Sequence, residues 1–152
     1  MTEKEEMIND FRFIFNFVRN TVSKNYSHMH LGDGQLRLIM YLMKDKEGKS
    51  QEELSKDLEL DKTSITRAIK RLEGNGYVKR ERNPKDRRSY SVYLTDAARE
   101  IYPNIIRNKE IMERILMQGI SEDEFRQFSD TLKKIRRNIK KYEEDKAGEL
   151  ND

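Results

Sequence analysis

The hydrophobic pattern of this 152-residue chain changes its period near residue 77, and this change constrains the fold more than any other feature. Before it, apolar residues recur every three or four positions, which is the period of helices. From Tyr77 to Leu94 apolar and polar residues alternate, as in strands, around a turn at Asn83–Asp86. After Thr95 the helical period returns. We therefore expect a mainly α protein with a small β-hairpin.

Capping residues divide the region before the hairpin into short helices. Asp33 and Asp61 stand where N-caps are expected, and Ser50 with Glu53 has the spacing of a capping box. Gly74 or Gly76 is expected to end the third of these helices in a left-handed turn. The residues expected to face inward are Leu36, Ile39, Met40 and Met43, then Leu54 and Leu58, then Ile65, Ala68, Ile69 and Leu72. Three short helices followed by a hairpin predict a winged helix-turn-helix.

Long apolar stripes mark the helices at both ends of the chain. Thr95 is expected to cap a helix that Pro103 kinks unless it lies in the first turns, and Ser121 with Glu124 caps the last helix. Because a small central unit cannot cover both stripes, we expect these helices to pack on each other and on a second copy of the chain. The expected dimerisation residues are Met7, Phe11, Ile14, Val18, Phe125, Phe128, Leu132, Ile135 and Ile139.

These patterns predict one compact domain with three segments. Residues 1–30 form the N-terminal dimerisation helix, residues 31–98 the winged helix-turn-helix, and residues 99–152 the C-terminal dimerisation helices. No run approaches the roughly 20 apolar residues of a membrane span, and the acidic N-terminus does not resemble a signal peptide. We therefore expect a soluble, cytoplasmic protein with no membrane partner.

Positive charge is concentrated in the middle of the chain. The formal net charge is only +3, yet residues 61–88 hold ten Lys or Arg residues and four acidic ones. Such clustering predicts a surface that binds a polyanion, because each neutralised phosphate releases counterions. The absence of cysteine excludes a disulfide framework, a thiolate metal site and a thiol redox sensor.

The helix that begins after Asp61 turns a polar face away from its core stripe. At about 100° per residue, Thr63, Arg67 and Lys70 lie opposite Ile65. Arg can grip guanine with two hydrogen bonds, and Thr can use either its hydroxyl or its methyl group. The alternative is a solvated face, but the helix-turn-helix spacing and the basic hairpin favour DNA. The flanking candidates for DNA contact are Ser64, Thr66 and Arg71.

Two further elements are expected to contact the DNA backbone or grooves. Ser50 and Gln51 begin a helix whose free amides can hold a phosphate, with simple capping as the alternative. In the hairpin, Arg87 is expected to enter the minor groove while Asp86 pairs with an arginine to hold the tip, and Arg87 and Arg88 can exchange roles. The cations of the hairpin are Lys79, Arg80, Arg82, Lys85, Arg87 and Arg88.

These motifs resemble the MarR (multiple antibiotic resistance regulator) family. The resemblance rests on the residues from Leu54 to Arg67, on Ile69-Lys70-Arg71-Leu72-Glu73 with Gly76-Tyr77-Val78, and on Asn83-Pro84-Lys85-Asp86-Arg87-Arg88 running to Leu94-Thr95. It implies a homodimer that binds a pseudo-palindromic DNA site and usually acts as a repressor. Such a repressor is often released from the DNA by a small aromatic or phenolic ligand that binds between the winged helix-turn-helix and the dimer helices. The residues that we assign to such a ligand pocket are Phe15, His28, His30 and Met40.

Other functions are weaker readings of the sequence. Without cysteine, a phosphate-cradling glycine loop or distinctively spaced carboxylates, an enzyme is not indicated. His28 and His30 lack further ligands nearby, so neither a metal site nor a cofactor is expected. A winged helix that binds protein instead of DNA predicts acidic or apolar residues at Arg67, Lys70 and Arg87, and these positions are basic.

Overall fold

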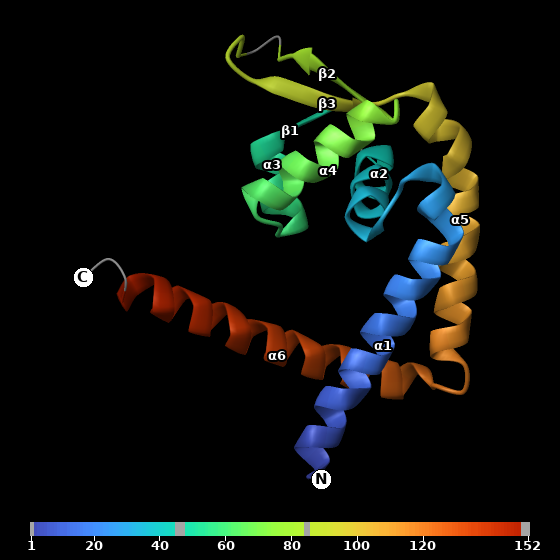
Figure 1. Cartoon of the computed structure of the whole chain (residues 1–152). Coiled ribbons are helices and arrows are strands. Elements are labelled where there is room, and N and C mark those ends of the chain that lie inside the picture. Colours follow the sequence, from blue (N-terminus) through green and yellow to red (C-terminus); the bar gives the residue numbers. More distant parts are fainter. Residues whose placement is uncertain (1, 45–47, 84–85, 150–152) are drawn as a thin grey trace. The chain divides into compact units, whose positions relative to one another are not determined.

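Helices dominate the computed structural model, which describes residues 2–44, 48–83 and 86–149 (Figure 1). The chain divides into two compact units, Met1–Met112 and Glu113–Asp152. The expected segment boundaries after residues 30 and 98 stay a prediction. The elements are α1 (Glu3–Tyr26), the 3-10 turn η1 (Ser27–Met29), α2 (Asp33–Lys44), β1 (Lys49–Ser50), α3 (Gln51–Leu58), α4 (Lys62–Gly74), β2 (Val78–Arg82), β3 (Tyr90–Leu94), α5 (Asp96–Met117) and α6 (Glu122–Glu149).

Three short helices form the centre of the first unit. Ser50 and Asp61 cap α3 and α4 as predicted, since each side chain accepts a hydrogen bond from the backbone N–H three residues on. Asp33 is instead the first residue of α2, and Gly32 precedes it. The Gln35 side chain reaches back to accept a hydrogen bond from the Gly32 N–H at 2.8 Å. The predicted N-cap at Asp33 is therefore displaced by one residue.

The core lies where α2, α3 and α4 meet the sheet. The predicted stripe of α4 is confirmed, because its four residues are buried. In α2 the predicted stripe is only partly right: Met40 and Met43 are half-buried, whereas Leu38 and Leu42 are buried. The helix packs on both α4 and β3, so it buries a wider arc than a one-sided stripe. The fully buried large side chains are Leu38, Ile39, Leu54, Ile65, Ile69, Leu72 and Val92.

The predicted hairpin is part of a three-stranded antiparallel sheet with the order β1-β3-β2. β2 pairs with β3 in a register that sets Val78 opposite Leu94, and Lys49 of β1 lies opposite Val92. The prediction missed β1, which is two residues long and carries no alternation. Val92 and Leu94 are buried, but Tyr90 is 48% exposed. Tyr90 pairs with Arg82 at the outer end of the β2–β3 ribbon, and this ribbon extends away from the helices in Figure 1.

The turns on either side of the sheet join it to the helices. Gly76, with φ of 78°, supplies the left-handed stop after α4, and Gly74 is still helical. The Thr95 hydroxyl donates to the Gly76 carbonyl oxygen at 2.6 Å and accepts a hydrogen bond from the Ala98 N–H at 3.4 Å. Thr95 therefore caps α5, as predicted. Pro103 lies inside α5 without interrupting the helix.

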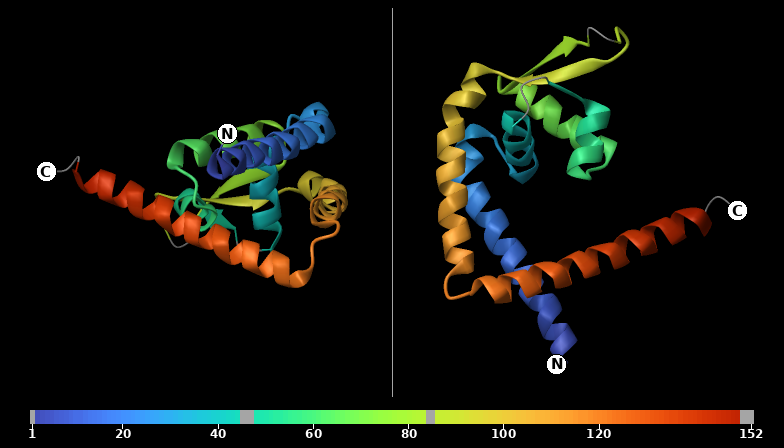
Figure 2. Two further views of the ribbon diagram at one scale, coloured as in Figure 1. Left: turned by 90° about the horizontal axis from the view of Figure 1, so that it is seen from below. Right: turned by 180° about the vertical axis from the view of Figure 1, so that it is seen from behind.

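The last residues of α1 lie beside α5 within the first unit (Figure 2). Tyr26 is buried there, and its hydroxyl oxygen accepts a hydrogen bond from the Asn108 side chain at 2.9 Å. At its other end, α1 begins with a capping box of Thr2 and Glu5, which the sequence reading missed.

The second unit contains α6. Its predicted capping box is present: the Ser121 N–H donates to the Glu124 carboxylate at 2.8 Å, and the Glu124 N–H donates to the Ser121 hydroxyl at 3.3 Å. No described residue of α6 is buried, and Phe128 and Ile139 are 50% and 52% exposed. Among the described helices, none is both long and apolar enough to cross a membrane.

Candidate nucleic-acid interface

The start of α4 is held by a double hydrogen bond to its cap. The Ser64 N–H donates to Asp61 Oδ1 at 2.8 Å, and the Ser64 hydroxyl donates to Oδ2 at 2.6 Å. These hydrogen bonds, the one from the hydroxyl above all, lower the pKa of Asp61. The Ser64 hydroxyl, a candidate for DNA contact, is therefore used inside the cap.

The outer face of α4 carries polar side chains that solvent can reach. Thr63, Arg67 and Lys70 are exposed, and the buried Ile65, Ala68 and Ile69 occupy the opposite side. In the described part of the chain, neither Arg67 nor Lys70 has an acidic partner within ion-pair distance. Two cations are therefore available on one face of an exposed helix.

Gln51 and Thr66 link the start of α3 to the middle of α4. The Gln51 side-chain nitrogen donates a hydrogen bond to the Thr66 hydroxyl oxygen. The same hydroxyl donates to the Lys62 carbonyl oxygen at 2.6 Å. This pairing was missed because the two residues are far apart in the sequence. It places two predicted DNA-binding residues side by side.

Ser50 takes part in the capping box of α3. Its N–H donates to a Glu53 carboxylate oxygen at 2.8 Å, and its hydroxyl accepts from the Glu53 N–H at 3.2 Å. The hydrogen bond from the Ser50 N–H is the main reason that the pKa of Glu53 is lowered. The capping alternative for Ser50 is therefore present in the structure, and phosphate binding by the same residues stays a prediction.

The cations of the hairpin, expected as one DNA-binding group, fall into two classes. The Arg80 guanidinium donates two hydrogen bonds to the Glu73 carboxylate of α4. Lys79 Nζ lies 2.6 Å from Glu81 Oε1 on the same strand. These two cations therefore have a structural role that the sequence reading did not assign. In the described residues, by contrast, no acidic partner is present for the exposed side chains of Arg82, Arg87 and Arg88. Lys85 lies outside the described residues.

Asp86 shapes the end of the hairpin through backbone hydrogen bonds. Its carboxylate accepts from the Arg88 N–H at 3.0 Å, and its carbonyl oxygen accepts from the Ser89 N–H at 3.0 Å. The expected partner was an arginine side chain, and the partner found is the backbone of Arg88. A carboxylate that binds the N–H two residues on is a common way to fix a turn.

Comparison with known proteins identifies the chain. The MarR family model matches residues 35–90. The HTH-type transcriptional regulator YdgJ of Bacillus subtilis is 34% identical over 113 residues, which are 74% of this chain and 69% of that protein. The chain belongs to the MarR family. Its relatives are named as transcriptional regulators, in agreement with the expectation of a regulator and not an enzyme.

Solved MarR regulators share the fold. One from Methanosarcina mazei Go1 is 29% identical and covers 90% of this chain and 98% of its own, with a TM-score of 0.73. Another, from Listeria monocytogenes and complexed with 26mer DNA, is 28% identical, with 87% of both chains covered and a TM-score of 0.73. The predicted winged helix-turn-helix is therefore confirmed.

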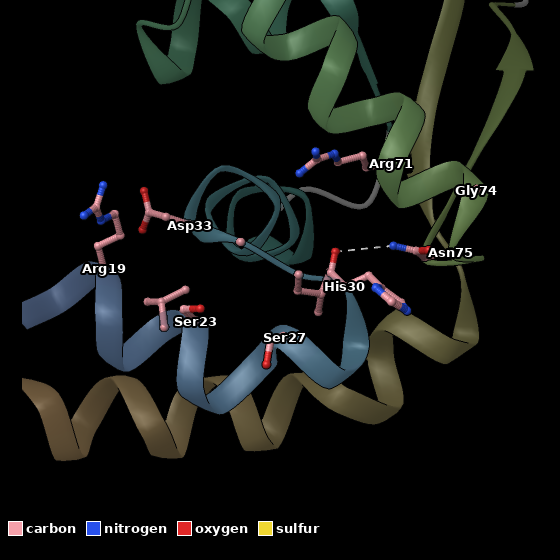
Figure 3. Close-up of a pocket in the computed structure, with 11 residues that line it drawn as sticks. Arg19, Ser23, Ser27, His30, Asp33, Arg71, Gly74 and Asn75 are labelled. Carbon is pink, nitrogen blue, oxygen red and sulfur yellow. Dashed lines mark hydrogen bonds between the residues drawn. The ribbon is translucent and has the colours of Figure 1, made fainter. Parts of the chain in front are cut away.

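A shallow hollow of about 620 Å³ lies between α1, the start of α2 and the end of α4 in this MarR-family chain (Figure 3). Arg19 and Ser23 line it from α1, Asp33 from α2, and Arg71 from α4. Of the four residues assigned to an effector pocket, His30 lines this hollow, and its carbonyl oxygen accepts a hydrogen bond from the Asn75 side chain at 3.5 Å.

The remaining three residues of the expected pocket lie elsewhere. Phe15 is 64% exposed on α1, where Arg19 lies over its ring, and His28 is exposed in η1. Met40 packs against the core from α2. The structure of this single chain therefore does not bring the four residues together.

Proposed function

We propose that this MarR-family chain is a sequence-specific repressor that binds double-stranded DNA as a homodimer. Its site is a pseudo-palindromic operator, which it leaves when a small aromatic or phenolic effector binds. The observation that carries the proposal is the outer face of α4, where Thr63, Arg67 and Lys70 are exposed opposite the core. A regulator of this kind acts where the DNA lies, so a cytoplasmic location belongs to the proposal.

The α4 face has the chemistry of a major-groove reader. A guanidinium such as that of Arg67 can donate two parallel hydrogen bonds to guanine, and an ammonium such as that of Lys70 can meet either a base or a phosphate. The cap at Asp61 and the buried stripe hold the helix so that this face stays outward. The complex of the Listeria monocytogenes relative with 26mer DNA supports DNA binding by this chain.

The other predicted contacts come from α3, the hairpin and the end of α4. Ser50 and Gln51 stand at the start of α3, where free amides can bind a phosphate. Arg87 or Arg88 enters the minor groove from the hairpin, and Asp86 keeps the tip in shape through the Arg88 N–H. Arg71, which lines the hollow, and Lys85 complete the set of predicted contacts.

Exposed apolar side chains support the proposed homodimer. In α1, Met7 and Ile14 are 42% and 43% exposed, and in α6 Phe128 and Ile139 are exposed by about half. Apolar surface of this extent on long helices is typical of an interaction face. The remaining residues of the proposed interface are Phe11, Val18, Phe125, Leu132 and Ile135.

Sedimentation tests the dimer directly. We expect the native chain to sediment as a dimer at micromolar concentration and the double variant Phe128→Glu and Ile139→Glu to sediment as a folded monomer. The variant Lys140→Glu, which changes charge on the same helix outside the apolar stripe, should remain dimeric. A monomeric native chain would refute the dimer and the paired half-sites.

Regulation by an effector requires a ligand that binds one dimer geometry better than another. Such a ligand shifts DNA affinity only by its differential affinity, commonly about 1–3 kcal/mol. Titration of the protein–DNA complex with small aromatic acids tests this part. If no compound changes the affinity, the chain is a constitutive DNA binder.

Selection of bound duplexes from random or genomic DNA tests the function as a whole. We expect one pseudo-palindromic motif to be enriched, with half-sites about one helical turn apart. The logarithm of the association constant should fall linearly with the logarithm of the salt concentration. The slope of that line should be about −0.9 for each phosphate contacted. Enrichment of no sequence above the input would overturn the proposal.

A further inference from the structure

The hydroxyl of Thr66 is already occupied inside the protein. A threonine hydroxyl has one hydrogen to donate and two lone pairs to accept with. Its hydrogen goes to the Lys62 carbonyl oxygen, one turn earlier in α4, at 2.6 Å. One lone pair accepts the hydrogen bond from the Gln51 side chain. The hydroxyl therefore has no hydrogen left to donate to a base or a phosphate.

The three hydroxyls at the start of α4 are consequently not equivalent. The Ser64 hydroxyl donates to the Asp61 cap. In the described part of the chain, the Thr63 hydroxyl has no hydrogen-bond partner within the protein. Thr63 can donate to DNA without breaking an internal bond, whereas Thr66 cannot.

We propose that Thr66 reads DNA through its methyl group and that Gln51 is the residue that positions it. The proposal rests on the proposed function, because it assumes that α4 lies in the major groove. Thr66 is exposed beside the outward face of the helix. Thymine is the base that presents an apolar group there, its C5 methyl. The protein accordingly prefers thymine at the position that Thr66 faces.

Gln51 matters because it selects one orientation of the Thr66 side chain. Rotation of Thr66 toward a base would break the bond to Lys62 and leave the Gln51 nitrogen without its acceptor. Both bonds therefore favour the orientation in which the hydroxyl has no hydrogen left for the DNA and the methyl group is free for an apolar contact. The two helices of the helix-turn-helix contribute jointly to this contact.

Replacement of thymine by deoxyuridine tests the proposal, because it removes only the C5 methyl. Each thymine of the duplex selected by the native chain is replaced in turn. We expect about a fourfold loss of affinity at one position in each half-site, which corresponds to the burial of about one methyl group. Replacement of a thymine elsewhere in the half-site should leave unchanged the part of the affinity that comes from the contact of Thr66.

Variants then assign the preference to its residue. Thr66→Ser should bind the thymine and deoxyuridine duplexes equally at that position. Thr66→Val should keep the preference without the hydrogen bonds, because its two methyl groups replace the hydroxyl and the methyl of threonine and its χ1 angle is restricted in a helix. Gln51→Met removes the side-chain nitrogen that donates to Thr66 and keeps a side chain of similar length. It should reduce the ratio of the affinities for the thymine and deoxyuridine duplexes toward one. Thr131→Ser is the control, because it deletes a methyl group on α6 from a threonine whose hydroxyl likewise donates to the carbonyl oxygen one turn earlier, and it should leave the ratio unchanged. Circular dichroism checks that each variant is folded.

The outcomes separate this proposal from the proposed function. If the native chain binds its selected motif but tolerates deoxyuridine at every position, the methyl reading is wrong and the regulator function stands. A preference that Thr66→Ser keeps and Thr66→Val loses would assign the contact to the hydroxyl and overturn the proposal. If the native chain selects no motif, the proposed function fails and the reading by Thr66 fails with it.

Discussion

The ion pair of Arg80 and Glu73 joins the hairpin to the end of α4, and its removal tests how the hairpin is held. Arg80 Nε donates to Glu73 Oε1 at 3.1 Å, and Nη2 donates to Oε2 at 2.5 Å. The two side chains are 46% and 36% exposed, so water screens their attraction. Exposed pairs contribute about 0–1 kcal/mol, and the two-pronged geometry favours the upper half of that range.

A double-mutant cycle measures this coupling. We expect Arg80→Ala, Glu73→Ala and the double variant to give a coupling free energy of about 0.5–1 kcal/mol at neutral pH, from urea unfolding followed by circular dichroism. The pair of Lys79 and Glu81 is the control, since it is more exposed and joins residues of one strand. Its coupling should be smaller. A coupling of zero for the Arg80 pair, or equal couplings for both pairs, would refute the reasoning.

The coupling should also depend on pH. The hydrogen bond from Arg80 holds the pKa of Glu73 below its ordinary value of 4.5. Because the pKa is lower in the folded state, the stabilisation is present above the unfolded value and is lost as the pH falls through the folded value. Repetition of the cycle in strong acid should therefore give no coupling. A coupling that persists there would show that it does not come from the charged pair.

Three further predictions follow from the caps, the core and the hairpin. Asp61→Ala should destabilise the chain in urea unfolding and Asp61→Asn should not, because asparagine also caps helices; equal losses would contradict the role of the cap. Leu54→Ala should lower the free energy of unfolding by about 2–5 kcal/mol, because Leu54 is fully buried. The control is Leu58→Ala, since Leu58 is only half-buried, and an equally small loss for both variants would show that this part of the core is misplaced. Arg87→Ala should lose most affinity in fluorescence anisotropy on duplexes with A·T-rich flanks, where the minor groove is narrow, and equal losses on all flanks would argue against minor-groove entry.

Local signals in the sequence predicted the three short helices and, for α3 and α4, the residues at which they start. The capping boxes at Ser50 and Ser121 and the N-cap at Asp61 each join residues three apart. Both partners of each hydrogen bond therefore lie in one short stretch of sequence. The stripe of α4 was equally readable, because the helix buries a single face. The rotation of about 100° per helical residue also predicted that Thr63, Arg67 and Lys70 lie on the outer face.

Contacts between distant parts of the chain could not be predicted in this way. The bond of Gln51 to Thr66 and the pairing of β1 with β3 depend on how separate elements pack. The same holds for the partnership of Arg80 with Glu73, which removes one cation from the group that the sequence presents as available for DNA. The burial of Leu38 in α2 likewise depends on two neighbours that the sequence pattern does not reveal.

The affinity of Arg67→Ala for the selected duplex and for single base-pair changes in it tests the central claim most directly. Reading of DNA by the outer face of α4 predicts a loss of about 1–3 kcal/mol on the selected duplex and the disappearance of the preference at one base pair of each half-site. The other preferences should persist, and Lys70→Ala should weaken all duplexes alike if Lys70 meets only phosphate. Native affinity and native preferences in the Arg67→Ala variant would contradict the account.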